Sequence, residues 1–175
     1  MEHYTEAIVL NRDSKNDLDA SLSLYTKDLG RIIAKAKSIR RLTSKLSGHL
    51  TPGALIKVRI IEKNGNGHQI IDALSFYYKV DLEILRFLSF INSMTPLNEP
   101  DLHLWYEAKK ILESGKINIE GYRRILKIIG YDPKNAQCDN CGSTKIAYFV
   151  PSDIMFLCSK CLSVSGINKD DIFSI

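Results

Sequence analysis

Residues 138–161 read CDNCGSTKIAYFVPSDIMFLCSKC and contain all four cysteines of the chain. The cysteines form two C-x2-C pairs, Cys138 with Cys141 and Cys158 with Cys161, separated by sixteen residues. Each pair can form a tight turn that directs two thiolates at one point, and two such turns complete the tetrahedral coordination that zinc adopts. The spacing therefore predicts one Zn²⁺ ion per chain, bound by these four thiolates.

A zinc ion with four protein ligands has no open position for water or substrate, so we expect this metal to be structural. A catalytic zinc deaminase would carry a glutamate two residues after a histidine ligand. No histidine of this chain is followed by glutamate at that spacing: His3, His49, His68 and His103. A redox-active dithiol pair, disulfide bonds and a site without metal are the alternatives.

The segment between the two cysteine pairs is typical of a β-hairpin. Residues 146–150 and 154–157 are largely apolar and flank the turn sequence Pro151-Ser152-Asp153. With a cysteine pair near each end, this hairpin predicts a four-cysteine zinc ribbon.

Three segments before the cysteines show the apolar periodicity of amphipathic helices. They are residues 80–91, 102–112 and 119–129. Asn118 is a suitable N-cap for the third helix, and Gly130 is a suitable residue to end it. Such short helices are not stable alone, so we expect a short helical bundle that packs on neighbouring structure.

The N-terminal part of the chain has the pattern of strands. Five short segments are rich in β-branched, leucine and tyrosine residues: 5–10, 20–25, 31–36, 55–61 and 69–77. Lys27-Asp28-Leu29-Gly30 and Asn64-Gly65-Asn66-Gly67 are turn sequences between them. Five antiparallel strands in so short a stretch bury a core only by curling, which predicts an OB-type β-barrel, with an open SH3-like barrel as the alternative.

The sequence thus predicts an α+β protein in several parts. The first domain, residues 1–79, is a nucleic-acid-binding OB fold. The second, residues 80–175, is helical and contains the zinc module at residues 138–161.

The charge of the chain is unevenly distributed. Its net charge is +4, but residues 27–59 carry nine basic residues against one acid, Asp28. A local positive field of this kind indicates a face that binds a polyanion, although a solvated face of mixed function is the alternative. The candidate DNA-binding residues are Lys27, Arg31, Lys35, Lys37, Arg40, Arg41, Lys45, Lys57 and Arg59.

Aromatic residues on the expected strands have two possible roles. Tyr25, Phe76, Tyr77 and Tyr78 can stack on bases, as aromatics do on OB folds, or fill the core of a small barrel. Trp105 lies in a helical apolar stripe, so we expect it in the core.

No part of the sequence indicates a membrane or a secretory route. The N-terminus lacks the basic region of a signal peptide, and no segment approaches the ~20 apolar residues of a membrane span. We therefore expect a cytoplasmic protein, where cysteines stay reduced and available for metal.

Three stretches resemble one known family, the bacterial recombination mediator RecO. The first is TEAIVLNR at residues 5–12, followed by SLSLYTKDLGRIIAKAKSIRR at residues 21–41. The second is IIGYDPKNAQCDNCG at residues 128–142, and the third is the pair of cysteine turns with its interval.

The resemblance implies a non-enzymatic protein of DNA repair and recombination. It implies an OB domain that binds single- and double-stranded DNA, strand annealing, and loading of the RecA recombinase. It further implies RecR and the acidic, Phe-ending tail of single-strand-binding protein as partners. By position, the resemblance implies that one strand and the loop after it contact DNA through Arg31, Lys35, Lys37, Arg40 and Arg41.

Three other functions fit parts of the pattern. A generic module of replication or transcription, with an OB fold and a zinc ribbon, would bind nucleic acid without annealing it. A nuclease would need clustered carboxylates near the basic residues, where only Asp28 lies. A protein-interaction scaffold would use the basic face to bind an acidic protein.

The last residues combine acidic and apolar side chains. Lys169-Asp170-Asp171-Ile172-Phe173 places two acids before an apolar pair, a composition similar to the tail that the RecO family recognises. The favoured interpretation is a frayed polar terminus in which Ile172 and Phe173 pack locally. The alternative is a tail that occupies a partner pocket of the chain itself or of a neighbouring molecule.

Overall fold

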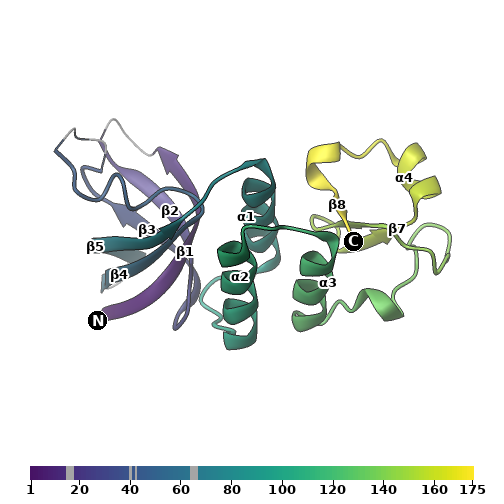
Figure 1. Cartoon of the computed structure of the whole chain (residues 1–175), viewed down its shortest axis with the longest axis horizontal. Helices are drawn as coiled ribbons and strands as arrows, with labels where there is room; N and C mark the ends of the chain where they lie inside the picture. Colours follow the sequence, from purple (N-terminus) through teal and green to yellow (C-terminus); the bar gives the residue numbers. More distant parts are fainter. Residues whose placement is uncertain (15–17, 40, 42, 64–66) are drawn as a thin grey trace. The chain divides into compact units, whose positions relative to one another are not determined.

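The computed structural model describes residues 1–14, 18–39, 41, 43–63 and 67–175. The chain forms two compact units, which we call unit 1 (Met1–Gly115) and unit 2 (Lys116–Ile175) (Figure 1). Residues 64–66 of the expected turn Asn64-Gly65-Asn66-Gly67 lie outside the described residues.

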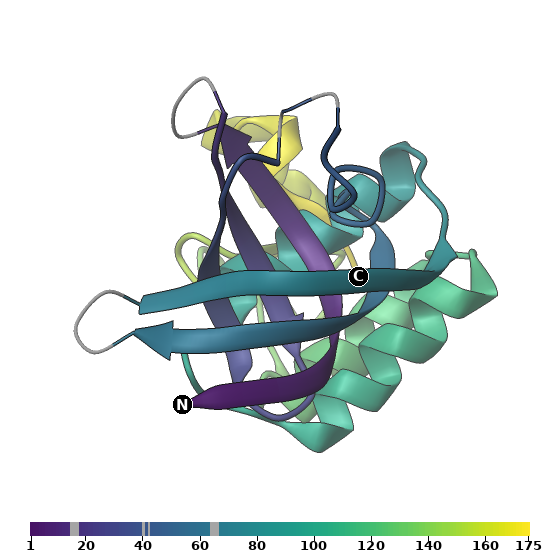
Figure 2. The ribbon, with the colours of Figure 1, turned by 90° about the vertical axis from the view of Figure 1, so that its left-hand side faces the viewer.

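Unit 1 begins with a closed five-stranded barrel in the order β1-β2-β3-β5-β4 (Figure 2). This is the OB-type barrel that the strand pattern predicted. The expected segments all lie within strands, which extend them at one or both ends. The strands are β1 (Glu2–Ser14), β2 (Ala20–Thr26), β3 (Gly30–Ala36), β4 (Ala54–Lys63) and β5 (Gly67–Tyr78).

One strand pair differs from the expected all-antiparallel arrangement. β3 and β5 run parallel and pair Lys35 with Gln69, whereas the other four pairs are antiparallel. The reason is the crossover after β3: residues 37–53 carry the chain to β4, and the β4–β5 hairpin then returns β5 in the direction of β3.

β1 closes the barrel because it pairs on both sides. Its first half, Glu2–Ile8, pairs with β4, and its second half, Ala7–Ser14, pairs with β2. A β-bulge between Val9 and Asn11 interrupts the register with β2. Bulges bend and twist a strand, as a strand shared between two sides of a barrel must.

Alternate residues of each strand point into the barrel, where small and branched side chains fill a narrow interior. On β3, for example, Ile32, Ala34 and Ala36 are buried while Ile33 and Lys35 are exposed. The strand residues of the core are Ala7, Val9, Ala20, Leu22, Leu24, Ile32, Ala34, Ala36, Ala54, Ile56, Val58, Ile60, Ile70 and Ala73.

Helices α1 (Leu82–Met94) and α2 (Leu102–Ser114) complete unit 1. They cover outward-facing residues of β1 and β2, so Tyr25 is 1% exposed and lies with its ring centroid 6.2 Å from that of Trp105. The Tyr25 hydroxyl donates to the Asp101 carbonyl at 3.3 Å. Trp105 is a core residue as predicted, and Tyr25 fills the core rather than offering a stacking surface.

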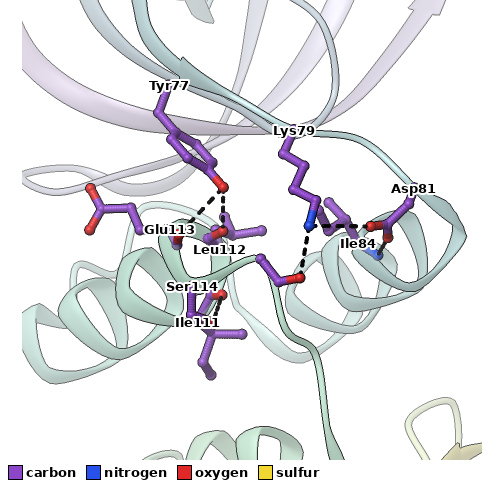
Figure 3. A network of polar contacts seen from close by, with 9 residues as sticks. Tyr77, Lys79, Asp81, Ile84, Ile111, Leu112, Glu113 and Ser114 are labelled. Carbon is purple, nitrogen blue, oxygen red and sulfur yellow. Dashed lines mark hydrogen bonds and ion pairs between the residues drawn. The ribbon is translucent and has the colours of Figure 1, made fainter.

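A polar network joins the end of β5 to both helices (Figure 3). Lys79 Nζ donates to the Gly115 carbonyl at 3.0 Å and lies 3.9 Å from the Asp81 carboxylate, which caps α1. The Tyr77 hydroxyl donates to the Leu112 carbonyl at 3.0 Å. The predicted domain boundary after residue 79 falls inside unit 1, between the last barrel strand and α1. The division of the chain into domains 1–79 and 80–175 stays a prediction.

Unit 2 contains α3 (Ile119–Ile128) and a small sheet in the order β7-β6-β8. The Asn118 side chain caps α3, as predicted, by accepting from the Gly121 N–H at 2.9 Å. The remaining elements are η1 (Pro133–Asn135), β6 (Tyr148–Val150), β7 (Met155–Leu157), α4 (Ser159–Ser165), η2 (Lys169–Asp171) and β8 (Phe173–Ser174). None of the helices in the described part of the chain is long and apolar enough to span a membrane.

The C-terminal residues pack within unit 2. β8 pairs with β6, and the Phe173 ring lies 5.4 Å from the Tyr122 ring of α3. Ile172, Phe173 and Ile175 are all buried. Local packing of Ile172 and Phe173 is confirmed. The expected fraying of the terminus is wrong, because Phe173–Ser174 pairs with β6 as a strand and Ile175 is buried.

Two glycines at positive φ provide a matched test of barrel packing. Gly30 has φ 68° and Gly67 has φ 71°, so alanine at either position costs about 1–2 kcal/mol of conformational strain. A Cβ at Gly30 would also overlap the Glu99 carbonyl, whereas a Cβ at Gly67 would meet no atom within 4 Å. We expect Gly30→Ala to lower the free energy of unfolding by about 1–3 kcal/mol more than Gly67→Ala.

The measurement is urea unfolding followed by the fluorescence of Trp105, the only tryptophan of the chain, which lies in unit 1. Equal losses in the two variants would contradict the close approach of Gly30 to Glu99.

Candidate metal centre and nucleic-acid interface

The fold brings the two cysteine pairs together. The four Sγ atoms of Cys138, Cys141, Cys158 and Cys161 all lie within 4.8 Å of one another, and those of Cys141 and Cys158 are 3.8 Å apart. Four thiolates around a tetrahedral zinc ion with bonds near ~2.3 Å would be about 3.8 Å apart. The cysteines are clustered so as to hold a metal ion.

Local backbone structure positions each pair. In the first turn, the Gly142 N–H donates to the Cys138 carbonyl at 2.7 Å, and Gly142 adopts a φ of 71°. In the second, Cys158 is the N-cap of α4, and its Sγ accepts from the Cys161 N–H at 3.5 Å. The helix α4 was not predicted from the sequence, although it orients the second pair.

The thiols titrate as a coupled set because they are so close. Burial acts to raise the pKa of Cys138, but the backbone N–H groups of Cys158, Cys141 and Asn140 together lower it to about 6. The hydrogen bond with Cys141, with burial in addition, raises the pKa of Cys161 to about 12. Backbone donors thus favour some thiolates, while full ionisation of the cluster needs a cation to balance the charge.

The donor set fits a structural metal. Cys138, Cys158 and Cys161 are buried, and they share an apolar cluster with Val150 and Leu157. All four coordination positions of a tetrahedral ion would be filled by sulfur, so the site would leave no position for substrate.

The cations predicted to bind DNA fall into separate groups. Lys35, Lys37, Arg41 and Lys45 are exposed at the end of β3 and on residues 37–53. We call these four side chains the basic loop group. Arg40 lies outside the described residues.

Apolar anchors hold the segment that carries the basic loop group. Ile39 and Leu50 are fully buried in the barrel core, and Leu46 packs against it. The Ser38 N–H donates to the Asp19 carboxylate at 2.8 Å, and His49 Nδ1 lies 2.8 Å from the Ser75 hydroxyl. Figure 2 shows the part of this segment at residues 43–53 at one end of the barrel. Its cations therefore extend from a supported backbone.

A second group, Lys27, Lys57 and Arg59, lines a hollow of about 550 Å³ on the outer surface of β1, β4 and β5. Acidic side chains share this surface: Arg59 is ion-paired with Glu2, and Glu6 and Asp72 line the hollow. Since its charge is mixed, this group offers a weaker positive field than the basic loop group.

Arg31 lies apart from both groups. Its Nε donates to the Thr95 carbonyl at 2.6 Å, and its carbonyl accepts from the Asn98 N–H at 2.8 Å. Burial lowers the pKa of Arg31. The side chain therefore ties β3 to the end of α1.

The aromatic candidates also separate. Phe76 and Tyr78 are 44% and 52% exposed, so both rings offer surface for stacking, and Lys109 Nζ lies 5.3 Å from the centroid of the Phe76 ring. Tyr77 and Tyr25 use their hydroxyl groups to bond carbonyls of unit 1.

A cluster of cations in unit 2 was not predicted from the sequence. Arg123, Arg124, Lys127 and Lys134 line one hollow beside α3. The sequence did hold a sign of this cluster, because Arg123, Arg124 and Lys127 are spaced so as to share the polar face of a predicted helix.

Known proteins are similar in sequence to this chain, both over its N-terminal barrel and over most of its length. The family described as "Recombination protein O N terminal" matches residues 1–77. A DNA repair protein RecO of Thermodesulfovibrio yellowstonii is 28% identical over 93% of this chain and 71% of its own length. The RecO proteins of Dehalococcoides mccartyi and Acetivibrio thermocellus are 28% and 27% identical over 90% of this chain, and 69% and 70% of their own lengths.

The metal centre is tested by Cys138→Ser, with Lys160→Ser as the control because Lys160 is an exposed residue inside the second cysteine pair. Metal binding supplies much of the folding free energy of such small modules. We expect Cys138→Ser to abolish stoichiometric metal binding and to expose the amides of residues 137–161 to hydrogen exchange. Elemental analysis and exchange mass spectrometry measure both effects.

Lys160→Ser should retain the metal and the exchange protection. Unchanged metal content in Cys138→Ser would show that these cysteines are not its ligands.

Proposed function

We propose that the chain is a RecO-type recombination mediator, a protein of DNA repair and recombination. Two findings support this: residues 1–77 match the RecO N-terminal domain, and nearly the whole chain is similar to RecO proteins. In this function it binds single- and double-stranded DNA, anneals complementary strands and helps to load a RecA-type recombinase together with RecR. The acidic tail of single-strand-binding protein is a further proposed partner, and the proposed location is the cytoplasm.

The basic loop group is the observation that carries this proposal. Lys35, Lys37, Arg41 and Lys45 are all exposed, and none has a carboxylate within 4.0 Å among the residues that the structure describes. Cations without internal partners can neutralise phosphates and release their counterions, which is the main source of nonspecific affinity for DNA. Arg40, which follows Ile39 directly in the sequence, is proposed to add to this face.

Phe76 and Tyr78 support the same proposal, because exposed aromatic rings on an OB-type barrel can stack on the bases of a single strand without sequence preference. Lys27, Lys57 and Arg59 are proposed as peripheral contacts, since acidic neighbours offset their charge. Arg31 contributes through the position of β3 rather than through direct contact with phosphate, because its guanidinium bonds the Thr95 carbonyl.

We propose that the metal is zinc and that it is structural. Thiolate-only coordination with sulfur atoms a few ångströms apart favours zinc among the common metals of proteins. A coordination sphere closed by the protein suits a supporting role, so the proposed mediator acts by binding and not as an enzyme.

The DNA face is tested by Lys37→Gln/Arg41→Gln, with Lys110→Gln as the control on an exposed position of α2. Each lost phosphate contact should lower the slope of log K against log salt by about 0.7 for single strands and about 0.9 for duplexes. The double variant should therefore bind oligonucleotides of every sequence more weakly, with slopes lower by about 1.4 and 1.8.

The measurement is a fluorescence-anisotropy titration at several salt concentrations. Lys110→Gln should behave as the wild type. A double variant with unchanged affinity and slope would move the DNA site away from residues 37–53.

Annealing separates a mediator from a generic DNA-binding module. The protein should accelerate pairing of complementary oligonucleotides coated with single-strand-binding protein, and Lys37→Gln/Arg41→Gln should slow this reaction in proportion to its weaker DNA binding. Pairing is followed by the energy transfer between dyes on the two strands. Tight DNA binding without any acceleration would favour the generic module.

A further inference from the structure

The hollow beside α3 has a strongly cationic wall. It has a volume of about 410 Å³ and lies entirely within unit 2. α3 contributes Arg123, Arg124 and Lys127, and η1 contributes Lys134. We call these four side chains the α3 cations.

The α3 cations are exposed and only partly balanced by acids. Arg123, Lys127 and Lys134 have no carboxylate within 4.0 Å among the described residues. Two acids line the hollow, and one of them, Asp132, accepts a hydrogen bond from the Lys134 N–H at 3.0 Å as the cap of η1. Four cations therefore face two carboxylates, one of which is already engaged with backbone.

The opposite face of α3 holds these cations in place. Tyr122, Ile125 and Leu126 are buried, and the Tyr122 ring packs on Phe173 at 5.4 Å. Arg123 and Lys127 are one helical turn apart, so their Cβ atoms are separated by about 5–6 Å on a fixed scaffold. The row of charge is thus a supported feature of unit 2.

The first cysteine turn adjoins the other wall of the hollow. Thr144 and Ile146 line it, and they follow the first cysteine pair closely in the chain. The Cys138 N–H donates to the Ser143 carbonyl at 2.8 Å, which joins this wall to the first turn of the cluster. The first cysteine turn therefore helps to position this wall of the hollow.

We propose that the α3 hollow is a second nucleic-acid site, which binds the phosphate backbone of a DNA strand independently of the barrel. A strand presents a linear series of charges, and the α3 cations form a series along one helix and onto η1, in which Arg123, Lys127 and Lys134 can each bond a separate phosphate oxygen. A single carboxylate or short acidic motif would need fewer cations than the hollow provides. The proposal rests on the proposed DNA-binding function and assigns it a second site.

Two strand sites on one chain have a functional consequence. Unit 1 carries the basic loop group and unit 2 carries the α3 cations, and the two units are covalently joined at Gly115 and Lys116. A strand bound by both units would gain affinity from the high effective concentration of the second site. Alternatively, each unit could hold one of two strands, which is what annealing requires.

The test uses the full chain with Arg123→Gln/Lys127→Gln, which removes two charges and keeps good helix formers in α3. The control is Lys110→Gln/Lys160→Gln, which removes the same charge from exposed positions outside both proposed sites. The probe is a fluorescent single-stranded oligonucleotide titrated at several salt concentrations. Metal content and the Trp105 unfolding transition establish that each variant is folded.

We expect the α3 variant to bind the oligonucleotide about ten-fold more weakly, with a salt slope lower by about 1.4, while the control remains within about two-fold of wild type. If the α3 variant matches the control, the second site is wrong. The second site is also wrong if oligonucleotide binding is unchanged but an acidic peptide ending in phenylalanine, titrated in parallel, loses affinity, since the hollow would then be a peptide site.

Failure of this inference is distinguishable from failure of the proposed function. A wild-type chain that binds no oligonucleotide overturns both. A wild-type chain that binds DNA and responds only to Lys37→Gln/Arg41→Gln overturns the second site alone.

Discussion

The double pairing of β1 closes the barrel, and the rest of unit 1 depends on this closure. Because β1 pairs with β4 through its first half and with β2 through its second, the five strands leave no open edge within the barrel. Closure confines the interior to small and branched residues such as Ala34 and Ala36, and it directs Lys35 outward by the alternation of the strand. It also provides the core into which Ile39 and Leu50 anchor the segment that carries the basic loop group.

Unit 2 has no barrel among its described residues and depends instead on the cluster that contains its cysteines. Its apolar cluster is built partly from the cysteines themselves, since Cys138, Cys158 and Cys161 pack with Val150 and Leu157. A bound metal would therefore join the hairpin, the helix α4 and the wall of the α3 hollow at one point. The strand β8 adds a second tie, because it pairs with β6 and places Phe173 against α3. These contacts explain how so small a unit can present a fixed row of cations.

Much of the fold could be predicted because its signals are local. Short segments rich in β-branched, leucine and tyrosine residues located all five barrel strands. Asn118 correctly marked the start of α3, and the C-x2-C spacing identified the cysteines that cluster. The features that escaped prediction depend on distant partners. The parallel pairing of β3 with β5 follows from the crossover between them, and β8 exists only because β6 offers it a free side. A two-residue strand has too short a pattern to be recognised alone.

The sequence by itself determined where the five barrel strands and the helices α1, α2 and α3 lie, which four sulfur atoms can share a metal, and that residues 27–59 are rich in positive charge. The tertiary structure alone decided how that charge is used. It separated Arg31, bonded to the Thr95 carbonyl, from the exposed Lys35 and Lys37, and it gathered Lys134 with the cations of α3. The physical reason is that residue type and spacing act through neighbours in the chain, whereas the exposure and partners of a side chain depend on which distant elements pack beside it.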